Sequence, residues 1–309
     1  MSDSPPRLSV VIPAFCEGST LLNCIAAVHK ECLSLEKPYE IILIDDGSPD
    51  QTWEVIQQEA GKSPVVRGFR FTRNFGKEAA LCAGLDMARG EAIILMDADM
   101  QHPPSLIPSM VHLWEKTGVN IVEAVKTCYA KETIINRFRR KAFYTILNRM
   151  SGFDLGKASD YKLIDKHVRD AWLRMGEKNV FFRGMIAWLG FKRAEIPFTV
   201  PERAGGQSKW SLFCLIRLAV TGITAFTSLP MHVATFGGVL FLVLGMGMGI
   251  YSLALKVAGK AIEGFTTVII LQLFTGSLIL VTLGVIGEYI GRIFDEVKNR
   301  PRYVIIDKV

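Results

Sequence analysis

The sequence predicts a doubly wound, mainly parallel α/β sheet, followed by an interfacial helix and a hairpin of two transmembrane helices. Up to about residue 125, short β-branched runs alternate with longer amphipathic stretches, as in βα units around a parallel sheet. Two later runs, residues 231–255 and 265–287, contain no Asp, Glu, Lys or Arg. Half of the 309 residues are apolar and the mean hydropathy is +0.27. This composition excludes a disordered, fibrous or purely cytosolic chain.

The α/β part contains five predicted strands and four predicted helices. The β-branched runs place strands at about 7–13, 39–45, 65–71, 91–97 and 119–125. The amphipathic runs between them place helices near 18–36, 50–61, 76–88 and 104–117. Capping residues support two of the helix starts, with Ser48 and Asp50 before the second helix and Pro103-Pro104 before the fourth.

The pattern is less regular from about 131 to 228. It indicates a basic helix at 131–150, a pair of strands near 159–164 and 191–200, and an apolar helical run at 208–228. The last run carries only two charges, so it could lie in the membrane interface or be a buried packing helix.

Each charge-free run exceeds the roughly 20 residues that a helix needs to cross the hydrocarbon core. The segment after 287 carries several cations, which favours a cytoplasmic C-terminus and therefore a two-span hairpin. We expect a cytoplasmic α/β domain at 1–205, a juxtamembrane helix at 206–229, two spans within 230–287 and a cytoplasmic tail at 288–309. The protein would then be a multi-pass protein of the cytoplasmic (inner) membrane. Glycines in the spans permit close helix packing, so a homo-oligomer remains an open alternative.

The net charge of +6 is compatible with several partners. With two apparent spans, an anionic membrane surface or a phosphate-bearing substrate fits it better than nucleic acid does. We therefore expect no nucleic-acid partner.

The most informative motif is Asp97-Ala98-Asp99-Met100-Gln101, at the end of an apolar strand. Ligands bind at the carboxyl edge of α/β sheets, and two carboxylates there can share a divalent cation that leaves positions open for phosphate oxygens. This chemistry suits a diphosphate leaving group. An isolated motif of this kind is also compatible with an ordinary loop or helix cap.

Two further strand ends carry similar signals. Asp46 and Gly47 close the second strand, where a carboxylate can accept hydrogen bonds from a ribose or a base, although the same residues suit a turn. Pro13 and Glu17 follow the first strand. Lys77 begins the helix after the third strand, where it could approach a phosphate or a sugar, or only belong to a helix cap. Together these ends outline one nucleotide-sized crevice.

The segments SVVIPAFCE, IDDGS, RNFGKEAALCAGL, MDADMQHPP, SDYKL, ERAGGQSKW and GEYIGR resemble a known family. The chain is similar over nearly its whole length to the membrane-bound polyprenyl-phosphate glycosyltransferases of the inverting family GT2, which includes dolichol-phosphate mannose synthase. The resemblance implies a GT-A fold and transfer of one sugar from a nucleotide donor to a polyprenyl phosphate on the cytoplasmic face.

The resemblance also implies roles for individual residues. Asp97, Asp99 and Gln101 would hold Mg²⁺ or Mn²⁺. Pro13, Glu17 and Asp46 would hold the nucleotide. Together with Gly47, Lys77 and Asp97, the other residues at these strand and helix ends, they make up the expected donor site. Asp160, with Asp99, would be catalytic, with Asp160 on the acceptor side of the site.

The sequence departs from the family pattern in places. Phe15-Cys16 stands where the family often has Tyr-Asn, which bears on base preference, and Ser159-Asp160-Tyr161 stands where it has Gly-Asp-Phe. The acid is kept. The chain has no Gln-x-x-Arg-Trp motif, which argues against a processive polysaccharide synthase.

The charge of a polyprenyl-phosphate acceptor indicates which catalytic groups the reaction needs. A phosphate monoester is already an anion at neutral pH, so it needs no powerful general base. The reaction must instead bring two anions together, which requires a metal on the diphosphate and cations around the lipid phosphate. Asp160 would orient the acceptor or collect its remaining proton. The candidate cations are Lys126, Arg139, Arg140, Arg203 and Lys209. The alternative for the basic helix is a solvated or headgroup-facing surface.

The sequence thus predicts a metal-dependent inverting hexosyltransferase. Its donor would be UDP-glucose or UDP-N-acetylglucosamine, its acceptor undecaprenyl phosphate, and its product a lipid-linked sugar for cell-envelope glycosylation. The alternative is a catalytically idle, membrane-anchored nucleotide-binding scaffold subunit. A transport role is weaker, because neither predicted span carries an ionisable Asp, Glu, Lys or Arg.

Overall fold

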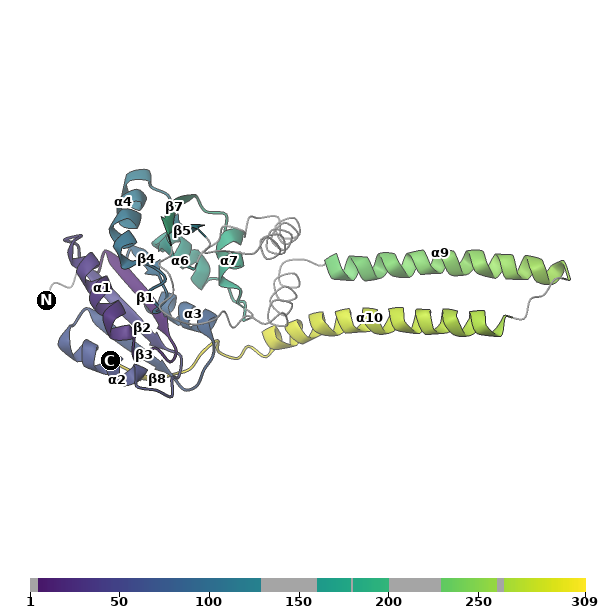
Figure 1. The fold of residues 1–309 in the computed structure, drawn as a ribbon, viewed down its shortest axis with the longest axis horizontal. Coiled ribbons are helices and arrows are strands. Elements are labelled where there is room, and N and C mark those ends of the chain that lie inside the picture. The colour runs from purple at the N-terminus through teal and green to yellow at the C-terminus, as the bar shows by residue number, and fades with distance from the viewer. Residues whose placement is uncertain (1–4, 129–159, 179, 200–228, 260–263) are drawn as a thin grey trace. The chain divides into compact units, whose positions relative to one another are not determined.

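The computed structural model describes residues 5–128, 160–178, 180–199, 229–259 and 264–309 (Figure 1). The chain divides into two units. The first comprises Met1–Ser211 together with Arg300–Val309, and the second comprises Leu212–Asn299. The second unit is therefore inserted, along the chain, between two segments of the first.

The first unit is built on an eight-stranded sheet of order β7-β5-β6-β4-β1-β2-β3-β8. The strands are β1 (Leu8–Ala14), β2 (Tyr39–Asp45), β3 (Val66–Phe71), β4 (Ala92–Leu95), β5 (Ile121–Cys128), β6 (Lys162–Asp165), β7 (Arg193–Thr199) and β8 (Ile305–Lys308). Strand β1 is parallel to β2 and β4, and β2 is parallel to β3. The carboxyl ends of these four strands therefore share one edge, where the candidate site lies.

Helices cover both faces of the sheet. They are α1 (Leu21–Leu33), α2 (Thr52–Lys62), α3 (Lys77–Met87), α4 (Ile107–Thr117) after a 3₁₀ turn (Pro104–Leu106), α6 (Lys166–Leu173) and α7 (Phe182–Trp188). Helices α1, α2 and α4 share one buried core with Val10 and Ile12 of β1. Val11 points to the opposite face, where α3 packs so closely that a Cβ on Gly84 would lie 2.1 Å from Val11 Cγ1. The predicted doubly wound sheet is confirmed, because both faces carry helices.

One pairing in the sheet differs from expectation. The predicted strands near 159–164 and 191–200 exist as β6 and β7, but they do not pair with each other. Strand β5 lies between them, antiparallel to β6 and parallel to β7. A local sequence pattern indicates that a segment is extended, but pairing depends on distant partners. The predicted basic helix at 131–150 and the run at 208–228 lie outside the described residues.

The C-terminal residues, expected only as a tail, form the edge strand β8, antiparallel to β3. Arg302 donates hydrogen bonds to the backbone carbonyls of Met175 (2.6 Å) and Glu177 (2.8 Å). Tyr303 stacks on Phe71 with ring centroids 5.1 Å apart, and its hydroxyl donates a hydrogen bond to Asp86. These contacts fasten the C-terminal segment to the first unit.

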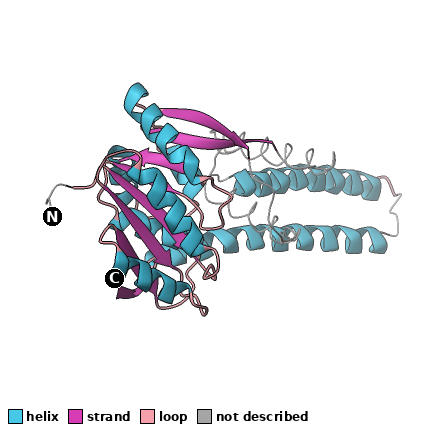
Figure 2. Cartoon of the chain, turned by 60° about the vertical axis from the view of Figure 1, so that its left-hand side comes forward, coloured by secondary structure: helices cyan, strands magenta, loops and turns pink. Residues whose placement is uncertain are grey.

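The second unit contains two long helices, α9 (Leu229–Val257) and α10 (Phe265–Val297). Both are long and apolar enough to cross a membrane. They lie side by side, with Phe241 stacked on Phe274 at a centroid distance of 5.3 Å (Figure 2). Helix α10 continues ten residues beyond the predicted end of the second span at 287, into a polar stretch that ends at Val297.

Candidate active site

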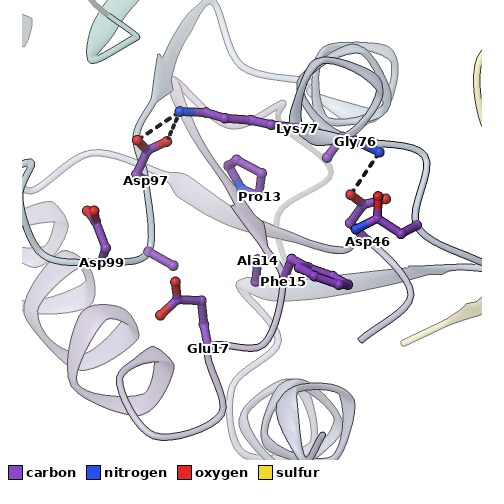
Figure 3. A pocket seen from close by; sticks show the side chains of 12 residues that line it. Pro13, Ala14, Phe15, Glu17, Asp46, Gly76, Lys77, Asp97 and Asp99 are labelled. Atoms are coloured by element: carbon purple, nitrogen blue, oxygen red, sulfur yellow. Dashed lines mark hydrogen bonds and ion pairs between the residues drawn. The ribbon is translucent and has the colours of Figure 1, made fainter. Parts of the chain in front are cut away.

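A cleft of about 300 Å³ opens at the carboxyl edge of β1, β2 and β4 (Figure 3). Six residues that the sequence assigned to the donor or the metal line it, namely Pro13, Glu17, Asp46, Lys77, Asp97 and Asp99. In Figure 3, Asp97, Asp99 and Glu17 surround one side of the cleft and Asp46 lies on the other. The size is at the lower end of the range for small-molecule pockets. The strand ends thus meet as predicted from the sequence.

The Asp97–Gln101 turn is held by hydrogen bonds to its own neighbours. The Asp97 N–H donates to Nδ1 of His102 (3.0 Å), and His102 is buried against Tyr161, with their rings stacked 4.9 Å apart. Met100 has φ of 58°, which bends the backbone so that the Gln101 N–H reaches Oδ1 of Asp99 (3.1 Å). The turn therefore presents both carboxylates to the cleft from a fixed backbone.

Asp46 positions a loop as well as lining the cleft. Its two carboxylate oxygens accept the N–H groups of Phe75 (2.7 Å) and Gly76 (2.9 Å). Gly47 does not line the cleft; its φ is 69°, and a Cβ there would lie 2.6 Å from the backbone of Arg73. Burial raises the pKa of Asp46, although the two N–H donors oppose the shift. Each carboxylate oxygen accepts one N–H and can accept a further hydrogen bond, so these contacts are compatible with donor binding. The donor role of Asp46 stays a prediction.

Asp160 lies opposite Asp97 because of the strand register. Strands β4 and β6 are antiparallel and their last pair is Leu95 with Lys162, so the chain beyond that pair brings Asp97 and Asp160, each two residues further along, to the same edge of the sheet. The Lys77 ammonium bridges them, 2.6 Å from Oδ1 of Asp97 and 3.0 Å from Oδ2 of Asp160. Arg183 holds Asp160 from another direction, with Nε 2.5 Å from Oδ1 and Nη2 2.6 Å from Oδ2. The site therefore contains a chain of alternating charges.

These contacts set the charge states of the site. Burial would raise the pKa of Asp160, but Arg183 and Lys77 outweigh it and hold that pKa far below its usual range. Burial would lower the pKa of Lys77, yet Asp97 and Asp160 raise it overall. Asp160 is thus a stable carboxylate. With so low a pKa it is a weak base, which favours positioning over proton collection.

Arg183 is a site residue that the sequence analysis missed. It lies in α7, within the otherwise apolar run 180–189 (VFFRGMIAWL). A cation in such a run must find a partner, and this signal could have identified it. The N–H of Phe182, just before it, donates to Glu78 (2.9 Å), and burial raises the pKa of Glu78 to about 7. Glu78 therefore fixes the start of the helix that carries Arg183.

The predicted metal set is only partly a cluster. Among the described residues, no group of three or more His, Cys, Asp or Glu side chains is arranged to hold a metal ion. Asp97 and Asp99 supply two carboxylates at one turn, and Asp97 already binds a cation, the Lys77 ammonium. Hard oxygen donors beside an open cleft suit Mg²⁺ or Mn²⁺, ions that keep further positions for substrate phosphate and water. The donor set therefore fits the ion, while the role of Gln101, whose side chain does not line the cleft, stays a prediction.

Most of the predicted acceptor-phosphate residues cannot be placed. Lys126 lies in β5 near its carboxyl end, but its side chain is outside the description. Arg139, Arg140, Arg203 and Lys209 all fall outside the described residues. Their roles stay predictions.

Comparison with known proteins identifies the family. Residues 9–180, which include all the described cleft residues and Asp160, match the family Glycosyl transferase family 2. The chain belongs to this family. The protein is therefore a glycosyltransferase, and the sheet with its carboxyl-edge cleft confirms the predicted GT-A-type fold.

The similarity extends over the whole glycosyltransferase, including α9 and α10. The SfII prophage-derived bactoprenol glucosyl transferase of Shigella flexneri is 35% identical over 97% of this chain and 97% of its own length. The uncharacterized glycosyltransferase YkcC of Bacillus subtilis is 36% identical over 97% of this chain and 93% of its own. Among solved structures, mannosyl-3-phosphoglycerate synthase from Rubrobacter xylanophilus is 18% identical with a TM-score of 0.49, covering 71% of this chain and 72% of that one.

Proposed function

We propose that the protein transfers one glucose from a nucleotide donor to undecaprenyl phosphate, with inversion, at the cytoplasmic face of the inner membrane. The observation that carries the proposal is the presence in one chain of the Asp97/Asp99 cleft and two membrane-length helices. Relatives named bactoprenol glucosyl transferase, about 35% identical, align across both parts. UDP-glucose is the first donor to test and UDP-N-acetylglucosamine the second.

On the donor side, the diphosphate would lie between Lys77 and the Asp97/Asp99 carboxylates. A bound Mg²⁺ or Mn²⁺ would neutralise charge on the leaving diphosphate. Asp97 and Asp99 would hold the ion, and Lys77 would add a cation from the start of α3. Asp46 keeps the 73–76 loop at the cleft wall, and the exposed Phe15 ring offers a surface for the base. Donor binding thus rests on three strand ends and one helix start.

On the acceptor side, the nucleophile is a phosphate oxygen that is already negatively charged. A strong base is unnecessary, and Asp160, held ionised by Arg183 and Lys77, is suited to orienting the two cations rather than taking a proton. The acceptor phosphate would bind to the cations expected from Lys126, Arg139, Arg140, Arg203 and Lys209. In-line attack from the side opposite the leaving group would then invert the anomeric centre.

Chain topology supports the membrane assignment. Unit 1 runs to Ser211 and resumes at Arg300, so the α9–α10 pair leaves and re-enters the same unit. Helices that start and end at one water-soluble unit cross a bilayer as a hairpin, because both ends must stay on that unit's side. The cations Lys298, Arg300 and Arg302 next to α10 favour the cytoplasmic side. Self-association through the span glycines stays part of the proposal.

The test is sugar transfer by the purified full-length protein in liposomes with Mg²⁺ or Mn²⁺ and undecaprenyl phosphate. UDP-glucose, UDP-N-acetylglucosamine and GDP-mannose are supplied separately, and the lipid product is analysed by mass spectrometry and NMR for its anomeric configuration. We expect a glucosylated lipid with UDP-glucose, lost in EDTA and in Asp99→Asn. Asp170→Asn, the same change at an exposed position of α6, is the matched control and should retain activity.

The outcomes separate the alternatives. Transfer of a different sugar would correct the donor but keep the reaction. Donor binding without transfer to any lipid phosphate would contradict the proposal and favour the nucleotide-binding scaffold. Transfer that persists in EDTA would contradict the metal requirement.

A further inference from the structure

The Lys77 side chain occupies the position of a counter-ion in the site. Its ammonium is within 2.8 Å of both oxygens of Asp97 and within 3.0 Å of one oxygen of Asp160. Lysine carries a compact point charge on a flexible stem, which allows it to bind carboxylates and phosphates alike. Lys77 is therefore bound to acidic groups before any substrate is present.

The strand register explains why a cation is needed here. Asp97 and Asp160 lie two residues beyond the last β4–β6 pair, Leu95 with Lys162, and both contact the same ammonium, so two like charges lie close together at this sheet edge and repel each other. Lys77 lies between them, and Arg183 compensates Asp160 from the other side. Two carboxylates are thus matched by two cations. Asp160 would keep Arg183 if Lys77 moved, whereas Asp97 has no other Lys or Arg within ion-pair distance among the described residues.

The second carboxylate of the turn is in a different state. Asp99 accepts the backbone N–H of Gln101, and no ion pair joins it to Lys or Arg among the described residues. A divalent ion entering the turn would therefore find Asp99 available and Asp97 already bound to Lys77. Since both oxygens of Asp97 contact the ammonium, the ion and Lys77 compete for the same carboxylate.

We propose that Lys77 is the resident counter-ion of Asp97, that it competes with the divalent ion in the absence of donor, and that it turns to the donor diphosphate when both bind. The inference rests on the proposed function for the donor and the ion. It gives Lys77 two successive partners. It also predicts that Lys77 weakens metal binding in the free protein and strengthens nucleotide binding once the ion is present. A lysine that bound only the donor would affect nucleotide binding and leave metal binding in the free protein unchanged.

The experiment measures Mn²⁺ binding to the full-length protein in detergent by electron paramagnetic resonance of free Mn²⁺, without nucleotide. Lys77→Met removes the charge and keeps the side-chain length. We expect it to bind Mn²⁺ at least about five-fold more tightly than wild type, because a cation within about 4 Å of the site is lost. UDP binding at saturating Mn²⁺ should weaken in the same variant. Lys77→Arg keeps the charge and should stay close to wild type in Mn²⁺ affinity.

Lys116→Met is the matched control, since Lys116 is exposed at the end of α4, towards the opposite edge of the sheet, and should not change either affinity. Unchanged or weaker Mn²⁺ binding by Lys77→Met overturns the inference, as does an equal gain in Lys116→Met or an absence of Mn²⁺ binding by wild type. Sugar transfer by wild type is measured separately. If the wild-type protein transfers no sugar, the proposed function is overturned even if the Mn²⁺ affinities shift as expected. If Lys77→Met binds Mn²⁺ with wild-type affinity, only the inference about Lys77 is overturned.

Discussion

Arg183 binds Asp160 through two parallel hydrogen bonds, from Nε to Oδ1 at 2.5 Å and from Nη2 to Oδ2 at 2.6 Å. A planar guanidinium matched to both carboxylate oxygens is among the strongest polar contacts a protein makes. It joins α7 to the start of β6, on the sheet edge that carries the cleft. The acid expected on the acceptor side is therefore already engaged by the protein.

Replacing Arg183 should make the sugar-transfer rate depend on the protonation of Asp160. In Arg183→Met the pKa of Asp160 rises, because burial then opposes only Lys77. Wild-type activity should be insensitive to Asp160 titration, since its folded pKa lies far below the working range. The variant should gain an acidic limb in its pH–rate profile and lose activity towards low pH. Sugar-transfer rates from pH 5 to 8 provide the measurement. Arg183→Lys, which keeps the charge but not the paired geometry, should be intermediate, and identical profiles for all three proteins would contradict this role.

Asp46 should matter for both the loop and the donor. Asp46→Ala leaves the half-buried N–H groups of Phe75 and Gly76 without their acceptor, which should cost about 1 kcal/mol of stability. The freed loop should also weaken nucleotide binding, by about ten-fold. Urea unfolding and calorimetric titration with UDP report the two effects. Asp50→Ala, a nearby acid outside the cleft that also accepts backbone N–H groups, should lose stability with little change in UDP affinity. Equal UDP affinities for wild type and Asp46→Ala would disprove the loop's part in binding.

Glu78 should make stability depend on pH in an unusual direction. Burial raises its pKa from 4.5 to about 7, so between these values the folded protein holds a proton that the unfolded chain has lost. Stability contributed by this proton is therefore fully present below about pH 4.5, falls as the pH rises between the two pKa values, and is lost above about pH 7. Glu78→Gln keeps an acceptor for the Phe182 N–H and should flatten this slope in thermal unfolding from pH 5 to 8. Exposed Glu54→Gln is the control. An unaltered slope in Glu78→Gln would show that Glu78 is not the titrating group.

Tyr303 should secure the edge strand β8. Tyr303→Phe loses the hydrogen bond to Asp86 but keeps the stacking on Phe71, so we expect a loss of about 1 kcal/mol. Tyr303→Ala loses both contacts and should cost more. Hydrogen exchange at the β3 amides that pair with β8 is the direct measurement, and it should rise in the order wild type, Phe, Ala. If the β3 amides exchange at the wild-type rate in both variants, Tyr303 does not secure β8, and the contacts of Arg302 hold the strand instead.

Much of the fold was predictable because the apolar and turn-forming residues of each strand and helix lie close together in the sequence. The β2 run was expected at 39–45 and is found at Tyr39–Asp45, since a continuous apolar run before Asp-Asp-Gly marks both a buried strand and its end. The cleft followed from the rule that parallel strands share a carboxyl edge. Six of the assigned residues line it for that reason.

The remainder depends on contacts between distant residues. Arg183 and Asp160 are 23 positions apart, and their meeting depends on β6 lying antiparallel beside β4, which no local pattern specifies. The insertion of β5 between β6 and β7 is non-local for the same reason. Strand β8 has only four residues and is mostly exposed, so its sequence lacks the apolar alternation that would have marked it. Its partner lies more than 200 residues earlier in the chain.

That separation fixes the order in which the molecule can be completed during synthesis. The edge of β3 is made early, but Ile305–Lys308 leave the ribosome only after both α9 and α10. Until then β3 presents unpaired backbone groups, which invite pairing with another chain. A nascent protein that stalls or is truncated within the apolar helices would keep this edge open, and we expect such products to aggregate through the sheet as well as through the helices.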